Sequence, residues 1–191
     1  LFAMSGYTSG HSTILKNVFQ INPGSFIVYK QGKVEINTYF KWGCVIKERN
    51  RNHLVGELKK INKKIILKLI KTSNNKHIIV PLSAGYDSRF IVSGLKELGY
   101  KKIITFSYGR KNNREAKIAK EIAHKLNLPW FFVPYTNKKL KKIALSEIHK
   151  KYIDFSDNLT SVYFPQDFAA VQFLKKNKLI PEKSIFVNGQ T

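Results

Sequence analysis

The sequence contains very little sulfur and few acidic side chains. Its 191 residues include one cysteine, one methionine and only 12 Asp and Glu, against 34 Lys and Arg. The single cysteine, Cys44, excludes a disulfide within the chain and any metal site built from several cysteines. The five histidines include no pair at metal-ligand spacing, so we expect surface or satisfied core residues rather than ligands.

Long apolar runs are also missing. No run reaches the ~18 residues that a membrane span needs. The start, Leu1-Phe-Ala-Met4, lacks the basic region and cleavage pattern of a secretory signal. We therefore expect a soluble, cytoplasmic protein with no membrane partner. A hydrophobic content of 43% and an aromatic content of 13% are typical of a globular chain with a real core.

Basic residues dominate the charge, and the net value of +22 raises the question of nucleic-acid binding. However, the basic residues are 29 lysines and only 5 arginines, spread over almost the whole chain. Recognition of phosphates or bases favours arginine and clustering. The interpretation we prefer is a solvated lysine surface, and nucleic acid is not expected as a partner.

The most informative stretch runs from Ile78 to Phe90. Residues 78–82 form a short, β-branched apolar run, which predicts a buried strand, and the polar turn 83–88 follows it. From Ser88 the apolar spacing becomes helical, and Gly99 provides a natural stop. The predicted order is strand, loop, helix.

A small-residue loop before a helix suits phosphate binding, because backbone amides and the positive end of the helix dipole converge there. Ser83 and Ser88 supply hydroxyl donors, and Gly85 allows close approach and an unusual φ. Asp87 either caps the helix or holds a bridging Mg²⁺, and we favour the magnesium interpretation. The alternative without a function is an ordinary strand-to-helix turn.

This loop resembles the PP-loop of ATP pyrophosphatases, whose signature is Ser-Gly-Gly-x-Asp-Ser. The six residues here are Ser83-Ala84-Gly85-Tyr86-Asp87-Ser88, so Ala84 replaces the first glycine and adds one methyl group. The loop is not a Walker A site, because it lacks the terminal Gly-Lys-Ser/Thr.

Further elements alternate in type. Strands are predicted at 102–109, 128–134 and 184–187, and helices at 53–72, 114–126, 137–152 and 164–174. This alternation predicts an α/β fold with a doubly wound parallel sheet, in which ligands bind beyond the carboxyl ends of the strands. Residue 82 with its loop and residues 107–109 should therefore face one crevice. The 53–72 helix should place Leu54, Leu58, Ile61, Ile65 and Leu69 against the sheet, and the 137–152 helix should turn Leu140, Ile143, Ala144 and Ile148 inward.

Two carboxylates, Asp154 and Asp157, lie in an expected loop at 154–163 and either bind metal or cap a helix, the second being preferred. The first forty residues predict a β-meander, with strands at 25–29 and 34–40 and a strand or turn at 14–21. Such a meander needs another surface to dock on.

Upstream of the loop, the order of a threonine, an apolar stretch, a Pro-Gly pair and a tyrosine resembles the closing strands of the glutaminase domain in the asparagine synthase family. Here these features are Thr13, 18–21, Pro23-Gly24 and Tyr39. The resemblance implies an internal fragment truncated at both ends. Its expected parts are 1–46 (end of a glutaminase-like domain), 47–76 (linker helix) and 77–191 (an incomplete PP-loop synthetase domain), with no glutamine hydrolysis by the missing N-terminal cysteine.

The same resemblance implies a set of site residues. The family binds ATP through the residue before the PP-loop, the end of the second strand and a Ser-Gly pair, followed by a glutamate that is an acid-base candidate. Here the glutamate position holds Gln190, which cannot move a proton, and the serine of the pair is Asn188. The implied ATP-binding residues are Leu82, Ser83, Gly85, Tyr108, Asn188 and Gly189; the implied catalytic residues are Asp87 and Ser88, with Asp87 also binding Mg²⁺.

The implied activity is adenylation of a carboxylate by ATP with release of pyrophosphate, followed by amidation with ammonia. The acceptor is aspartate or a related molecule. Ala84 and residues 86–89 look more like homologues from surface polysaccharide pathways, which leaves a sugar or another carboxylate open as the acceptor. The expected partners are this small carboxylate and ammonia or glutamine, with a homodimer left open. Two alternatives are a PP-loop ATPase that modifies tRNA and a non-catalytic ATP-binding or scaffold protein.

Overall fold

The computed structural model describes residues 5–43 and 50–189. The chain forms two compact units. One contains the residues up to 48 together with 146–164, and the other contains 49–145 and 165–191. The first unit thus combines two segments that are far apart in the sequence. The expected division, with boundaries at 46 and 76, did not group residues 146–164 with the N-terminal segment.

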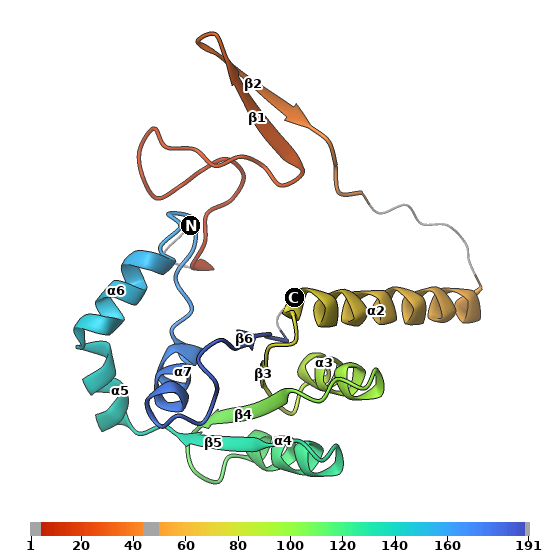
Figure 1. Cartoon of the computed structure of the whole chain (residues 1–191). Helices are drawn as coiled ribbons and strands as arrows, with labels where there is room; N and C mark the ends of the chain where they lie inside the picture. Colours follow the sequence, from red (N-terminus) through yellow and green to blue (C-terminus); the bar gives the residue numbers. More distant parts are fainter. Residues whose placement is uncertain (1–4, 44–49, 190–191) are drawn as a thin grey trace. The chain divides into compact units, whose positions relative to one another are not determined.

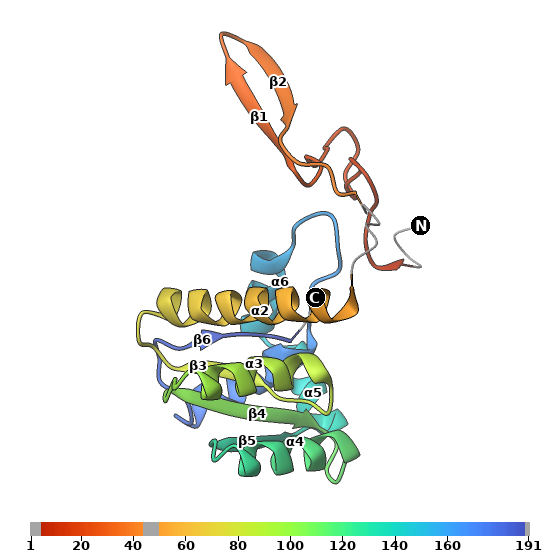
Figure 2. The same ribbon diagram turned by 90° about the vertical axis from the view of Figure 1, so that its right-hand side faces the viewer.

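The larger unit contains a four-stranded sheet in which every pairing is parallel (Figures 1 and 2). Its strand order is β5-β4-β3-β6. The strands are β3 (Ile78–Pro81), β4 (Ile103–Gly109), β5 (Trp130–Pro134) and β6 (Ile185–Phe186). The chain leaves β3 in the middle of the sheet, builds β4 and β5 on one side and returns to add β6 on the other. The predicted α/β class with a parallel sheet is confirmed.

Helices cover both faces of this sheet because successive strand residues point to opposite sides. On one face, Ile78 and Val80 pack with Val92 and Leu95 of α3 (Tyr86–Glu97). Residues of α2 (Arg51–Ser73) and α4 (Arg114–Lys125) join the same cluster. On the other face, Ile79 and Phe106 pack with Ala170 and Leu174 of α7 (Gln166–Lys176). The sheet is therefore doubly wound, as predicted.

Helix α2 buries a different stripe from the predicted one. Ile66 is buried in the core, and Leu69 and Ile70 pack beside it. Of the five residues expected to lie against the sheet, Leu69 does so, and the other four are about half exposed, namely Leu54, Leu58, Ile61 and Ile65. The prediction was wrong because apolar residues occupy adjacent positions such as Ile65 and Ile66, and periodicity alone does not choose between overlapping stripes.

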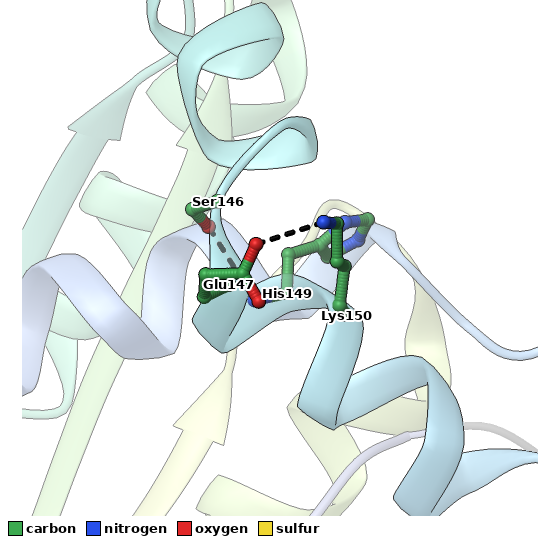
Figure 3. Close-up of polar contacts among 4 residues, drawn as sticks. All are labelled: Ser146, Glu147, His149 and Lys150. Carbon is green, nitrogen blue, oxygen red and sulfur yellow. Dashed lines mark hydrogen bonds and ion pairs between the residues drawn. The ribbon is translucent and has the colours of Figure 1, made fainter.

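The predicted helix at 137–152 is two helices, α5 (Asn137–Ala144) and α6 (Glu147–Ser156). Ser146 interrupts them, because its hydroxyl accepts a hydrogen bond from the amide of His149 at 3.4 Å and caps α6 (Figure 3). Lys150 and Glu147 form an exposed ion pair one turn into α6, at 2.8 Å. The break also corrects the expected buried stripe, since Ala144 and Ile148 are exposed.

The smaller unit contains an antiparallel hairpin of β1 (Ser25–Lys30) and β2 (Lys33–Thr38). Gln31 and Gly32 both have positive φ, 50° and 78°, as a tight two-residue hairpin turn requires. The third segment of the expected meander, 14–21, contributes no strand; it contains only one end of a bridge, between Ser12 and Phe19. The hairpin strands were therefore predicted correctly, and of the two alternatives for 14–21 the structure has the turn, at residues 16–17.

Residues 5–15 and 159–162 of this unit pair through their backbones. The amide of Thr8 donates to Thr160 at 2.7 Å, and the amide of Val162 donates to Gly6 at 2.8 Å. Asp157 ends α6, and its carboxylate accepts from the amide of Leu159 at 2.9 Å. Asp157 thus stabilises a turn, whereas Asp154 lies within α6 rather than in the expected loop.

Within the described part of the chain, no helix is both long and apolar enough to cross a membrane.

Candidate functional site

A cleft of about 260 Å³ opens at the carboxyl ends of β3 and β4 in the larger unit. Parallel α/β sheets bind ligands at this edge. All eight residues selected from the sequence line the cleft, and so do several that were not selected. The lining is Pro81, Leu82, Ser83, Gly85, Asp87, Ser88, Phe106, Ser107, Tyr108, Asn113, Glu115, Ala116, Gln166, Asp167, Asn188 and Gly189.

The loop after β3 is closed by its own two serines. The hydroxyl of Ser88 accepts a hydrogen bond from the amide of Ser83 at 3.1 Å, and the two hydroxyl oxygens lie 3.1 Å apart. The Ser83 hydroxyl also accepts from the amide of Gly85 at 3.1 Å. Both serines, which we expected to face a phosphate, therefore first hold the loop in shape.

Helix α3 begins at Tyr86, two residues earlier than the sequence indicated. Gly85 is its N-cap, with φ −70°, so the expected unusual φ is wrong. The glycine matters for space instead, because a Cβ there would lie 3.2 Å from the Ser83 hydroxyl. The first amides of a helix have no acceptor within the helix, and they give this end of the cleft a partial positive charge.

Asp87 is exposed in the first turn of α3. It does not occupy the capping position, which belongs to Gly85. Within the described residues, no group of three or more His, Cys, Asp or Glu is arranged to hold a metal ion. Mg²⁺ commonly uses one or two protein carboxylates together with substrate phosphates. Asp87 therefore fits a magnesium ion that arrives with a phosphate ligand, rather than a complete protein site.

Arg89 supports the outside of the loop. Its Nη2 donates to the carbonyl of Ala84, and its guanidinium lies 5.2 Å from the centroid of the Tyr86 ring. Its Nε is buried without a hydrogen-bond partner among the described residues. Ala84 stands where the signature has its first glycine. Arg89 therefore holds the backbone at this residue through the Ala84 carbonyl.

The end of β4 is tied to the end of β3 by Ser107. Its hydroxyl donates to the carbonyl of Leu82 at 2.7 Å and accepts from Nε1 of Trp130 at 3.0 Å. The amide of Leu82 donates to Phe106 at 2.8 Å. Leu82 is only 2% exposed, so it borders the cleft mainly through its backbone.

Tyr108, the next residue of β4, forms the aromatic wall of the cleft. Its ring stacks on Tyr135 with centroids 5.1 Å apart, and its hydroxyl lies near the carboxylate of Asp167. Burial raises the pKa of Tyr108 well above its ordinary value, and the Asp167 carboxylate raises that pKa further. Tyr108 therefore stays protonated.

The segment after β6 completes the cleft. The side-chain amide of Asn188 donates to Asp167 at 3.2 Å. A Cβ on Gly189 would lie 2.7 Å from the backbone nitrogen of Ser88, which no real side chain tolerates. Glycine is therefore required where this backbone meets the loop. Gln190, expected to replace a family glutamate, lies outside the described residues.

The charge of the cleft is opposite in sign to that of the chain. Its described lining contains three carboxylates, Asp87, Glu115 and Asp167, and no lysine or arginine. A polyphosphate bound here meets helix amides and hydroxyls on the loop side but no side-chain cation in this lining. Compensation of the charge of a bound phosphate would therefore require a divalent cation in addition to α3.

Besides Ser107, which was expected at the crevice but given no role, four polar residues of the lining were not predicted from the sequence, namely Asn113, Glu115, Gln166 and Asp167. Asn113 caps α4 by accepting from the amide of Ala116 at 2.7 Å. Asp167 was not noted because it lies in the first turn of a predicted helix, where an acidic residue is ordinary. Its place in the cleft becomes visible only when α7 is positioned beside β4 and β6.

Comparison with known families gives one match. Residues 77–171, just under half of the chain, match the family model described as "Queuosine biosynthesis protein QueC". The matched segment includes the loop, β3 to β5 and the start of α7. The chain has the fold of the PP-loop ATP pyrophosphatases. The more specific resemblance to asparagine synthases stays a prediction, and the loop 83–88 is called the PP-loop below.

Two solved structures show how far the similarity extends. An NH₃-dependent NAD synthetase from Campylobacter jejuni subsp. jejuni NCTC 11168, in complex with the nitrate ion, is 15% identical with a TM-score of 0.45. The alignment covers 71% of this chain and 56% of that one. A predicted subunit of tRNA methyltransferase from Methanocaldococcus jannaschii DSM is 22% identical with a TM-score of 0.35, covering 60% and 53%. The chain thus spans little more than half of either structure, and no curated protein matches it.

Proposed function

We propose that this protein binds ATP with its pyrophosphate part on the PP-loop and transfers the adenylyl group to an acceptor. The observation that supports this most directly is the loop itself. Ser83 to Ser88 is closed by its own hydroxyls at the N-terminus of α3, and it borders a cleft large enough for part of a nucleotide.

In the proposed reaction, an acceptor carboxylate oxygen attacks the α-phosphorus of ATP. The bond between the α-phosphorus and the bridging oxygen breaks, and pyrophosphate leaves with the electron pair. The first-turn amides of α3 stabilise the charge that builds on the leaving group. Ammonia then attacks the acyl adenylate, loses a proton and displaces AMP.

Individual residues have distinct proposed roles. Ser88 holds the loop closed, and Gly85 and Gly189 leave room for close backbone approach. Asp87 would hold Mg²⁺, which when bound supplies positive charge that offsets the charge of the pyrophosphate. Tyr108 and Leu82 border the part of the cleft beyond the loop, where the nucleoside would bind.

The preferred acceptor is a small carboxylate such as aspartate or a related molecule. The cleft volume of about 260 Å³ suits small ligands. Its carboxylates, Asp87, Glu115 and Asp167, would repel the phosphates of a nucleic acid at this edge. A second candidate is ATP-dependent modification of tRNA or of a nucleoside. The match to a queuosine biosynthesis family and the net charge of +22 favour it.

The experiment that separates these candidates measures AMP and pyrophosphate release by the full-length protein from ATP with Mg²⁺. One arm contains aspartate and ammonia, and the other contains bulk tRNA. The Asp87→Ala variant should lose at least tenfold in rate, whereas Asp154→Ala, on the exposed surface of α6, should retain the wild-type rate. Release that depends on aspartate supports the small-acceptor proposal, and release that depends on tRNA supports the second candidate. ATP binding without AMP formation in either arm would indicate a binding protein.

A further inference from the structure

Asp167 lies where three chain segments meet in the cleft. It is in the first turn of α7, and its carboxylate accepts a hydrogen bond from the side-chain amide of Asn188 at 3.2 Å. The same carboxylate lies near the hydroxyl of Tyr108 and helps to raise the pKa of that tyrosine. The carboxylate therefore ties the start of α7 to the segment after β6, close to the end of β4.

This network reaches the PP-loop through the backbone. Gly189 follows Asn188 and packs so closely on the loop that a Cβ would lie 2.7 Å from the nitrogen of Ser88 and 3.0 Å from its Cα. A shift of residues 188 and 189 would therefore press on Ser88, or open a gap beside it. Because Ser88 closes the loop, the position of Asn188 affects the amides that would face phosphate.

The start of α7 is also held by two tyrosines. Tyr108 stacks on Tyr135 at 5.1 Å, and the hydroxyl of Tyr135 donates to the carbonyl of Gln166 at 2.6 Å. Gln166 directly precedes Asp167. The Tyr135 hydroxyl therefore holds the start of α7 at the residue before Asp167, and the stack with Tyr108 links this contact to the end of β4.

We infer that Asp167 is a positioning residue for ATP, which holds the Asn188–Gly189 segment against the PP-loop so that the loop is preset for phosphate. The inference rests on the proposed function and assigns it a residue that neither the PP-loop signature nor the family resemblance includes. Asp167 acts through its neighbours. Exchanging the side chains of Asp167 and Asn188 therefore tests the inference more sharply than removing the Asp167 carboxylate.

The swap experiment uses Asp167→Asn, Asn188→Asp and the double variant in the full-length protein. Asp167→Asn replaces one of the two acceptor oxygens with an amide donor and removes the charge that strengthens the bond from the Asn188 amide, and Asn188→Asp brings two carboxylates together. The double variant again places one amide donor opposite one carboxylate acceptor. The affinity for α,β-methylene ATP with Mg²⁺ should fall about tenfold in each single variant and return to within about threefold in the double variant.

Two further measurements separate positioning from a general loss of structure. The thermal midpoint reports stability, and Asp154→Asn on α6 is the matched control, because it removes the same charge from an exposed helix position. The Mg²⁺ concentration needed for half-maximal binding should be the same in the double variant as in the wild type.

Several results would overturn the inference. The double variant could bind no better than the single variants, the affinity could follow the thermal midpoint alone, or the Mg²⁺ requirement could rise, which would make Asp167 a metal ligand. If the wild type binds no α,β-methylene ATP, the proposed function itself fails and the inference fails with it. If the wild type binds and the swap does not restore affinity, only the inference fails.

Discussion

The buried hydroxyl of Ser88 accepts a hydrogen bond from the amide of Ser83 at 3.1 Å, so the last residue of the PP-loop is tied to the first. Ser88 is 4% exposed and its oxygen also lies 3.1 Å from the Ser83 hydroxyl. The loop is thus closed before any ligand binds. Preorganised donors do not have to be ordered at the moment of binding, which saves conformational entropy.

Replacing Ser88 by alanine should open this loop. The amide of Ser83 loses its acceptor, so we expect a stability loss of about 1–3 kcal/mol and a roughly tenfold weaker affinity for ATP. Isothermal titration and urea denaturation measure the two effects. Ser93→Ala, at an exposed position of the same helix, is the control and should change neither. Unchanged ATP affinity in Ser88→Ala would contradict the role given to this hydroxyl.

Gly189→Ala tests the contact between the segment after β6 and the PP-loop. The added Cβ would lie 2.7 Å from the nitrogen of Ser88, so the backbone must move. Overpacking of this kind costs about 1–3 kcal/mol, and we expect at least a tenfold loss of ATP affinity. Gly56→Ala is the matched control, because no atom lies within 4 Å of its Cβ position in α2. That substitution should stabilise the protein by about 0.5–1 kcal/mol without changing ATP affinity.

Ser107→Ala tests the link between β3, β4 and β5. The substitution removes the acceptor for Nε1 of Trp130 and the donor to the carbonyl of Leu82. Leaving a partly buried indole N–H without an acceptor costs about 1–3 kcal/mol. Urea denaturation should show this loss with an unchanged slope, since the surface exposed on unfolding stays the same. A free energy of unfolding equal to that of the wild type would show that water replaces both partners.

Tyr108 gives a prediction about alkaline pH. Its ordinary pKa is 10.0, and burial together with Asp167 raises the pKa in the folded protein. The folded state therefore keeps the Tyr108 proton while the unfolded chain releases it. Stability contributed by this group is complete below pH 10 and falls as the pH rises above that value. The difference in unfolding free energy between the wild type and Tyr108→Phe should therefore shrink above pH 10. Lysine titration affects both proteins alike and cancels in this difference. An advantage that is constant across this range would contradict the prediction.

The fold could be predicted largely because the buried strands are continuous apolar runs. Residues 78–82, 102–109 and 128–134 are each bounded by polar segments, and helical spacing follows the first two. Parallel pairing then follows from alternation, and it brings the ends of β3 and β4 to one edge. This is why Leu82, the loop and Tyr108 could be assigned to one crevice before the structure was known.

The rest depended on tertiary contacts that the sequence does not display. Nothing in the apolar pattern of α2 distinguishes the stripe containing Ile66 from the one containing Ile65. The break at Ser146 depends on a capping bond that competes with a helical alternative. Asp167 is unremarkable within α7, and only the packing of α7 beside β4 and β6 places its carboxylate between Tyr108 and Asn188.

The most direct test of the proposed chemistry identifies the products formed from ATP. The full-length protein, given ATP, Mg²⁺ and an active acceptor, should form AMP and pyrophosphate in equal amounts, and Asp87→Ala should slow the formation of both at least tenfold. ADP and inorganic phosphate as the products would contradict the account, because they would mean that the terminal phosphate is transferred and that the PP-loop does not hold a pyrophosphate leaving group.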